Sequence, residues 1–188
     1  MKKRVAIFAS GEGSNFEKIA DNKDLKDKIK IEILVCDNKD APVIQKAEIR
    51  NIPTYVFSSK DFDSKEDYER EILKKVHNLD YIFLAGYMRI ISPYFLENYK
   101  NTIINIHPSL LPKYKGKNAI EKAYNANEKE IGVSIHYVNE EVDGGDIIAQ
   151  KSIEVSQSDT LEYVTEKIHK IEHELYPYVI LKLIKEEL

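Results

Sequence analysis

Short apolar runs alternate along this chain with amphipathic stretches, and this alternation constrains the fold more than any other feature. Residues 81–85, Tyr-Ile-Phe-Leu-Ala, form a continuous apolar run that is typical of a strand covered on both faces. Residues 64–78 place Tyr68, Ile72, Leu73 and Val76 on one helical face. A chain that alternates strands and helices in this way folds as a mainly parallel sheet with right-handed crossovers.

The same patterns predict the remaining elements. The expected strands are residues 5–9, 31–36, 54–57, 81–85, 102–107, 131–138 and 147–155, of which the last two form a hairpin. The expected helices are residues 15–21, 42–50, 64–78, 93–99, 117–125 and a last helix that runs to about residue 185, with Asp159 and Glu162 as candidate caps.

Composition excludes several classes of protein. The 188 residues carry a net charge of −4 without a long basic block, so we expect no nucleic-acid partner. No apolar run approaches the ~20 residues that span a bilayer, so we expect no membrane segment. The apolar stretch within the first ten residues is too short for the hydrophobic region of a signal peptide, so we expect a strand there. Cys36 is the only cysteine, which excludes an internal disulfide and suits a reducing cytoplasm.

Unusual polar groups follow three of the expected strands, at residues 10–15, 86–89 and 105–109. Ligands of parallel sheets bind outside the carboxyl ends of the strands. Asn105 and His107 are two residues apart, so on a strand their side chains share one face, and Pro108 ends the strand because it has no N–H. This pair puts a polarising amide beside a group that transfers protons. A lone histidine is more often structural, but the pair favours catalysis.

The glycine-rich segment at residues 10–15 has two interpretations. It can hold a phosphate with backbone N–H groups, Ser14 and Asn15, or it is a plain turn with Ser14 as N-cap and Glu17 completing a capping box. Phe16 stands where a dinucleotide fingerprint needs glycine, and no Walker lysine follows, so NAD and a Walker loop are excluded.

Further segments carry alternatives as well. The loop at residues 86–91 either lines a pocket for a flat heteroaromatic ligand or packs on the core. Asp143-Gly144-Gly145 is a hairpin turn or a ligand loop, and Asp143 is the preferred carboxylate partner for His107, with Asp146 the weaker choice. His136 lies two residues after Ser134 and can face the same site. His169 and His173 lack a third ligand, so no metal is expected.

Together these motifs resemble the phosphoribosylglycinamide formyltransferases, the folate-dependent enzymes of purine biosynthesis. The resemblance runs in order through residues 11–15, 62–65, 84–92, 105–112, 143–145 and 172–177. It implies a Rossmann-like, mainly parallel twisted α/β sheet with helices on both faces and an antiparallel hairpin toward the C-terminal half. One domain would cover residues 1–188, with a phosphate-binding half at about 1–100 and a catalytic and folate-loop half at about 101–188.

The resemblance also implies the reaction and the roles of residues. The formyl group of 10-formyltetrahydrofolate, the donor co-substrate, would move to the amine of glycinamide ribonucleotide directly, through a tetrahedral intermediate and without a metal. The implied catalytic residues are Asn105, His107 and Asp143. The ribonucleotide would contact Gly13, Ser14, Asn15 and, at its amine end, Glu172. The folate would contact Lys65, Met88, Arg89, Ile90, Ile91, Asn105, Asn139, Glu140, Glu141 and Val142.

Three departures and three alternatives remain at the level of sequence. Lys65 stands where some members have arginine, Asn118 replaces a common histidine, and many members continue further past the last helix, an extension we expect activity not to need. Formyltetrahydrofolate hydrolase and methionyl-tRNA formyltransferase share the residue 105–112 motif but usually carry an additional domain. A non-catalytic binding module is the third alternative. The sequence leaves open a monomer or a homodimer, and whether the Leu111–Pro112 bond is cis.

Overall fold

The computed structural model describes residues 1–186. They divide into two compact units, the first of residues 1–104 and the second beginning at Asn105. The strand β5 (Thr102–His107) crosses the division, so its first half belongs to one unit and its second half to the other. Within the described residues, no helix is long and apolar enough to cross a membrane.

The first unit is built on parallel strands. They are β1 (Lys3–Phe8), β2 (Ile29–Cys36), β3 (Thr54–Val56) and β4 (Tyr81–Leu84), followed by the start of β5. β1 pairs in parallel with both β2 and β4, and β2 pairs in parallel with β3. The central strand is fully enclosed, since Val5 through Ala9 are each 0% exposed. The apolar runs therefore mark buried strands, as the sequence predicts.

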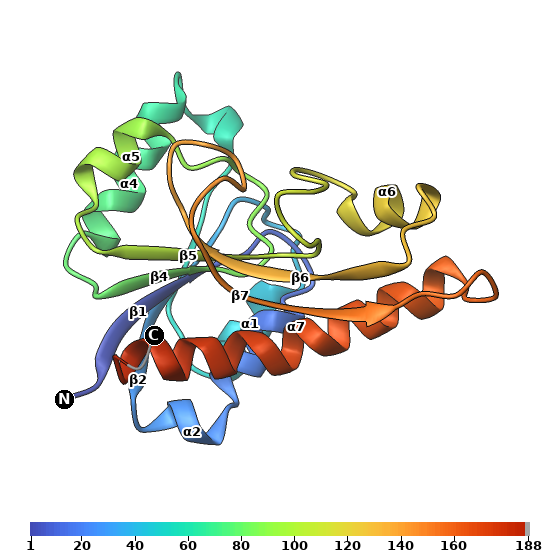
Figure 1. The fold of residues 1–188 in the computed structure, drawn as a ribbon. Helices are drawn as coiled ribbons and strands as arrows, with labels where there is room; N and C mark the ends of the chain where they lie inside the picture. Colours follow the sequence, from blue (N-terminus) through green and yellow to red (C-terminus); the bar gives the residue numbers. More distant parts are fainter. Residues whose placement is uncertain (187–188) are drawn as a thin grey trace. The chain divides into compact units, whose positions relative to one another are not determined.

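Helices connect these strands (Figure 1). They are α1 (Ser14–Ala20), α2 (Lys23–Lys26), α3 (Val43–Ile49), α4 (Lys65–Val76) and α5 (Pro93–Asn98), with a single 3₁₀ turn η1 (Ser59–Asp61). The pattern did not predict α2 and η1, because elements of four and three residues are too short to show a hydrophobic period. The buried face of α4 carries the expected Tyr68, Ile72, Leu73 and Val76.

The start of α1 differs from the capping box considered for this segment. Its N-cap is Gly13, with φ 72°, and no side chain caps the helix. An ideal Cβ on Gly13 would lie 2.3 Å from Cγ2 of Val43, so only glycine fits this left-handed turn beside α3. The capping box interpretation is therefore wrong, and the turn holds the backbone of residues 11–14 without help from Ser14.

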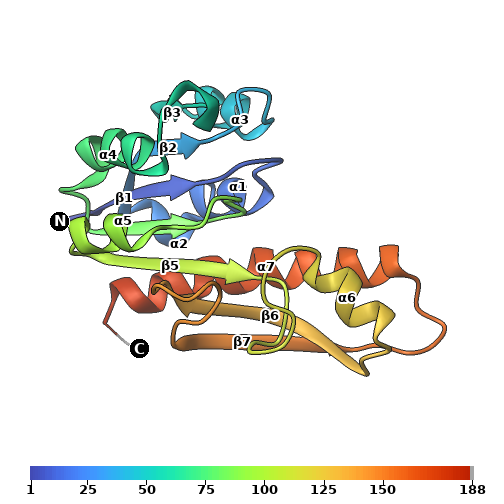
Figure 2. The same cartoon turned by 90° about the horizontal axis from the view of Figure 1, so that it is seen from above.

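The second unit begins with the end of β5 and continues through α6 (Ala119–Asn125), β6 (Glu130–Tyr137), β7 (Ile147–Glu154) and α7 (Leu161–Ile184). β6 and β7 are antiparallel, which confirms the predicted hairpin. The whole strand order is β3-β2-β1-β4-β5-β6-β7, a mostly parallel sheet with an antiparallel end. Figure 2 shows α7 running alongside β6 and β7.

The cap of α7 also differs from the prediction. Thr160 is the N-cap, and its side chain accepts a hydrogen bond from the N–H of Tyr163. Asp159 instead accepts from the N–H of Ser156 and closes the preceding turn, while Glu162 lies in the first turn of the helix. The sequence offered several oxygen-bearing side chains here, and backbone geometry selected among them.

A buried serine holds the segment that follows β5. Ser134 on β6 is 0% exposed, and its Oγ donates to the carbonyl of Ser109 at 2.6 Å. The same oxygen accepts from the N–H of Leu111 at 3.0 Å and from Nε2 of Gln150 at 2.8 Å. The Leu111–Pro112 peptide bond within this segment is cis. Ser134 therefore satisfies polar groups of a buried, irregular loop that has no strand partner.

Replacing Ser134 with alanine should destabilise the fold, because the donor and acceptor groups of the loop would remain buried without a partner. We expect a loss of about 1–3 kcal/mol in the free energy of unfolding, measured by urea denaturation. Ser158→Ala, at an exposed serine, is the matched control and should change this free energy little. Equal stability of the two variants would contradict the role given to Ser134.

Candidate active site

The end of β5 presents the amide and the imidazole together. Asn105 and His107 lie on one face of the strand, His107 is 6% exposed, and Asn105 is half-buried. Nε2 of His107 lies 2.9 Å from the carbonyl oxygen of Tyr114, so this nitrogen carries a proton and donates. Nδ1 of the same ring faces Oδ2 of Asp143 at 3.4 Å. Both ring nitrogens thus face oxygen acceptors.

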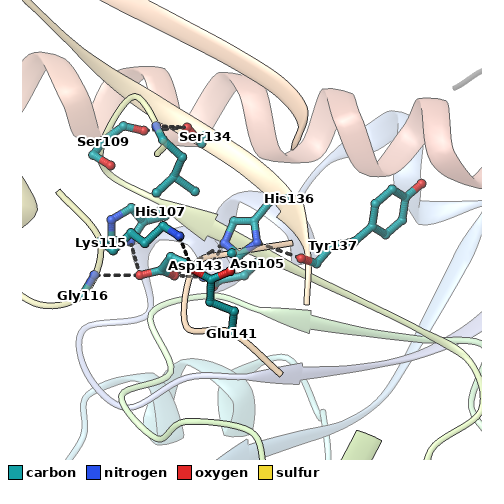
Figure 3. Close-up of polar contacts among 12 residues, drawn as sticks. Asn105, His107, Ser109, Lys115, Gly116, Ser134, His136, Tyr137, Glu141 and Asp143 are labelled. Atoms are coloured by element: carbon teal, nitrogen blue, oxygen red, sulfur yellow. Dashed lines mark hydrogen bonds and ion pairs between the residues drawn. The ribbon is translucent and has the colours of Figure 1, made fainter. Parts of the chain in front are cut away.

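Asp143 is the point at which these groups meet (Figure 3). Its Oδ2 accepts from the N–H of Gly116 at 2.8 Å. Its Oδ1 lies 3.4 Å from Nδ2 of Asn105 and 3.5 Å from Nε2 of His136. The residue has φ 49°, a left-handed conformation that aspartate tolerates better than most residues. The structure therefore brings Asn105, His107 and Asp143 together, with His136 as a fourth member.

The surroundings of Asp143 keep its carboxylate ionised. Burial alone raises the pKa of Asp143, but His136, the N–H of Gly116 and the charge of His107 outweigh burial and lower this pKa below the ordinary value. A buried carboxylate that accepts several N–H groups is an anion throughout the neutral range. It can balance positive charge on the neighbouring imidazole ring.

His136 holds the amide of Asn105. Its side chain is almost fully buried, Nδ1 donates to the carbonyl of Tyr137 at 2.8 Å, and Nε2 lies 3.2 Å from Nδ2 of Asn105. The carbonyl oxygen can only accept, so Nδ1 carries a proton. Nε2 faces both the amide of Asn105 and, at 3.5 Å, Oδ1 of Asp143. The register of β6 and β7 shifts between Ile135 and His136, and such bulges re-aim side chains near functional sites.

The loop that carries Asp143 is folded back onto β6. An ideal Cβ on Gly145 would lie 1.7 Å from the carbonyl oxygen of Tyr137, so only glycine allows this approach. Asn139 accepts from the N–H of Glu141 and donates to the carbonyl of Gly144, and Glu141 pairs with Lys115 at 2.6 Å. Val142 is 42% exposed, and Glu140 is exposed as well. The second glycine therefore shapes a packed loop rather than a minimal turn.

Two backbone groups that contact the site residues were not predicted from the sequence. The carbonyl of Tyr114 and the N–H of Gly116 hold His107 and Asp143, and both come from the irregular segment between β5 and α6. Tyr114 and Gly116 have positive φ angles of 55° and 79°. A glycine three residues after Lys113 is the only hint of this turn that sequence reasoning could have used.

In the first unit, the predicted phosphate loop keeps an unpaired acceptor. Oδ1 of Asn15 is buried, and the described residues give it no hydrogen-bond partner. Gly13 is fixed by its contact with Val43, and Ser14 is the first residue of α1. A buried polar atom without a partner is uncommon and points to a missing ligand or water.

The loop at residues 86–91 is also in the first unit. Met88 and Ile90 are 60% and 56% exposed, whereas the side chain of Ile91 is buried in the core. Arg89 pairs through Nε with Asp37 at 2.7 Å. The loop therefore exposes two apolar side chains, as a pocket wall does, and does not pack wholly on the core.

Two further predicted contacts lie at helix positions. Lys65 is the first residue of α4, after the N-cap Ser64, where the helix dipole disfavours a cation. Glu172 on α7 is only 5% exposed, so it does not lie on a solvated helix face, and its Oε2 accepts from Nδ1 of His169 at 2.7 Å. Across residues 1–186, no group of three or more His, Cys, Asp or Glu is placed to hold a metal ion.

Comparison with known proteins decides the family. A family model described as formyl transferase matches residues 3–180. The chain belongs to the formyl transferase family. The phosphoribosylglycinamide formyltransferase of Bacillus subtilis (strain 168) is 45% identical over 185 residues, which are 97% of this chain and 95% of that protein. The family resemblance and the enzyme class predicted from the sequence are confirmed.

Solved structures of the formyl transferase family share the fold. The glycinamide ribonucleotide transformylase 1 of Geobacillus kaustophilus has a TM-score of 0.93 and 46% identity, covering 98% of this chain and 100% of that one. The phosphoribosylglycinamide formyltransferase of Bacillus halodurans has a TM-score of 0.93 and 42% identity, and the match covers 99% of this chain and 97% of that one. The predicted fold class, a mainly parallel sheet with an antiparallel hairpin, is confirmed.

The pairing of His169 with Glu172 predicts a pH dependence of stability. The hydrogen bond from His169 to the Glu172 carboxylate raises the pKa of His169 above its ordinary value of 6.5. A raised folded pKa stabilises the fold fully below that ordinary value and loses its effect as the pH rises through the folded pKa. We expect the wild type to exceed His169→Gln in free energy of unfolding more at about pH 5.5 than at about pH 9. A difference that is equal at both pH values, in urea titrations, would contradict the pairing.

Proposed function

We propose that this chain transfers the formyl group of 10-formyltetrahydrofolate to the amine of glycinamide ribonucleotide, giving formylglycinamide ribonucleotide and tetrahydrofolate. The observation that carries the proposal is the buried cluster of Asn105, His107 and Asp143 in a member of the formyl transferase family. The named relatives are phosphoribosylglycinamide formyltransferases that match nearly the whole chain, which supports the same acceptor here.

The cluster supplies what the transfer needs at the formyl oxygen. When the amine attacks the formyl carbon, the carbonyl π electrons move to oxygen, and negative charge develops there. A donor that is already in place lowers the barrier, and the loss of one such donor costs about 10²–10³ in kcat. Asn105 has two amide hydrogens. One faces Nε2 of His136 at 3.2 Å, and the other donates to Oδ1 of Asp143 at 3.4 Å, a long hydrogen bond. We assign this longer bond as the one that the formyl oxygen shares when the donor is bound.

Proton movement is assigned to His107 and Asp143. The attacking amine must lose a proton, and the departing folate nitrogen must gain one, so the net reaction moves one proton and needs no outside acid. The 3.4 Å separation between Nδ1 of His107 and Oδ2 of Asp143 leaves this edge of the ring open to exchange with a substrate oxygen or a water. The ionised Asp143 stabilises positive charge on the ring while the proton is in transit. No covalent enzyme intermediate is required.

The donor is assigned to two groups of residues. In the first unit, the exposed Met88 and Ile90 offer an apolar face for the flat pterin, and Lys65 offers a cation for the glutamate tail. Arg89 and Ile91 belong to the same loop. In the second unit, the folded-back loop supplies Asn139, Glu140, Glu141 and Val142, next to Asn105 and Asp143.

The acceptor is assigned to residues at two helices. The phosphate is given to donors: the backbone N–H groups at Gly13 and the side chains of Ser14 and Asn15, the latter through its amide NH₂. The buried Oδ1 of Asn15 has no partner in the described chain, and as an acceptor it suits a hydroxyl or a water rather than a phosphate oxygen. The amine end is given to Glu172, whose buried carboxylate keeps one oxygen, Oε1, beyond the one bound by His169. A carboxylate acceptor suits an amine N–H.

Hydrolysis of the same donor, with water as acceptor, is the rival activity. The decisive experiment is a spectrophotometric assay of folate release from 10-formyltetrahydrofolate, run with and without glycinamide ribonucleotide. We expect product only with the ribonucleotide. Equal release without it would assign the chain to hydrolysis. Binding of both ligands with no release in either case would leave a non-catalytic module and refute the transferase.

Removing the imidazole should abolish most turnover while the fold stays intact. His107→Gln should reduce kcat by about 10²-fold or more, since the ring acts on the developing charge and the moving proton. The assay is steady-state transfer at saturating donor and acceptor, with circular dichroism to verify folding. His77→Gln, at an exposed histidine at the end of α4, is the control and should keep wild-type turnover. A folded His107→Gln variant with wild-type kcat would exclude the assigned role.

A further inference from the structure

A buried carboxylate outside the catalytic cluster ties down the loop at residues 86–91. Asp37 is the first residue after β2, and its side chain is only 6% exposed. Burying a carboxylate costs free energy unless the charge is paired and hydrogen-bonded. An aspartate without such partners at the end of a strand would normally face the solvent. Its burial here therefore calls for partners, and the structure supplies two.

The two carboxylate oxygens of Asp37 reach consecutive residues of the loop. Oδ2 accepts from Nε of Arg89 at 2.7 Å. Oδ1 accepts from Oγ of Ser10 at 2.5 Å, and the same Oγ accepts from the backbone N–H of Met88 at 2.8 Å. One arm is therefore direct, and the other passes through a serine that is 9% exposed. Together they fix the backbone at Met88 and the side chain at Arg89.

The loop needs such anchors because it has little regular structure of its own. Between the end of β4 and the start of α5, no residue is helical or in a strand. Gly86 begins the loop in a left-handed conformation with φ 78°, and its carbonyl accepts from the N–H of Ser10. Met88 and Ile90 stand 60% and 56% exposed on either side of Arg89. The contacts of Ser10 and Asp37 hold the backbone that carries these apolar side chains.

The pairing also sets the charge that the loop presents. Arg89 is the one ionisable cation between Gly86 and Ile91, and its guanidinium is matched by the buried carboxylate of Asp37. The loop therefore offers no net positive charge to an anion. It offers two apolar side chains and fixed backbone groups, which suit a flat, uncharged heteroaromatic ring.

We propose that Asp37, acting through Ser10 and Arg89, is a positioning residue that holds the 86–91 loop ready for the ring of the formyl donor. The inference rests on the proposed function, which assigns this loop to the donor. A preformed loop does not have to be ordered when the ligand binds, and that saves binding free energy. Asp37 touches neither the reacting atoms nor the acceptor, so its effect falls on the affinity for the donor.

The test is Asp37→Asn, which keeps the shape of the side chain and removes its charge. We expect KM for 10-formyltetrahydrofolate to rise about tenfold, the scale of one charge-assisted hydrogen bond, while kcat and KM for glycinamide ribonucleotide change far less. Direct titration with a stable 10-formyl folate analogue should show the same loss. Asp40→Asn, an exposed aspartate three residues further on, is the matched control and should behave as wild type.

The outcomes separate this inference from the proposed function. A wild-type chain that neither transfers formyl nor binds the analogue overturns the function. If the wild type transfers formyl and a folded Asp37→Asn variant has an unchanged KM for the donor, only the inference is overturned. Equal losses in kcat, in KM for the donor and in KM for the ribonucleotide would overturn it as well. If Asp37→Asn does not fold, Ser10→Ala, which removes the link from Asp37 to the N–H of Met88, decides by the same criteria. The double variant should be no worse than the more affected single variant, because both substitutions break one link.

Discussion

The buried carboxylate of Asp143 is the contact on which the cluster of Asn105, His107 and His136 depends. Within 3.5 Å it reaches the N–H of Gly116, the ring of His107, the amide of Asn105 and the ring of His136. These partners come from β5, β6 and the segment between β5 and α6. A single ionised group therefore sets the orientation of several side chains, and burial makes each of these contacts stronger than it would be in water. Without that anion the cluster would have no common acceptor.

Glycine and serine residues, together with the buried carboxylates, hold the irregular backbone around these sites. Gly145 lets the loop that carries Asp143 fold against the carbonyl of Tyr137, which no larger residue would permit. Ser134 on β6 forms hydrogen bonds with the backbone of the loop after β5, at Ser109 and Leu111. The first unit uses the same principle with a different carboxylate, since Asp37 and Ser10 hold a loop that lacks regular structure. In both units, a buried anion stabilises an irregular loop beside a strand.

Sequence alone predicted the parts of this structure that repeat or alternate. Apolar runs revealed the strands, and the two-residue spacing revealed that Asn105 and His107 share a face. It could not predict the carbonyl of Tyr114 or the N–H of Gly116, because backbone groups leave no side-chain signal. It also missed Asp37, since an aspartate after a strand looks like any polar loop residue until its burial is known. The predictions of the helix N-caps were wrong because several nearby residues could serve as the cap, and only backbone angles distinguish them.

The most direct measurement is the steady-state kinetics of Asp143→Asn with 10-formyltetrahydrofolate and glycinamide ribonucleotide. The substitution keeps the size of the side chain but removes the anion that His107, Asn105 and Gly116 share. We predict a fall in kcat of about 10²-fold or more in a variant that is folded and binds the ribonucleotide as the wild type does. A folded variant whose kcat stays within about twofold of wild type, well short of the effect of one lost donor, would contradict the central place of this carboxylate.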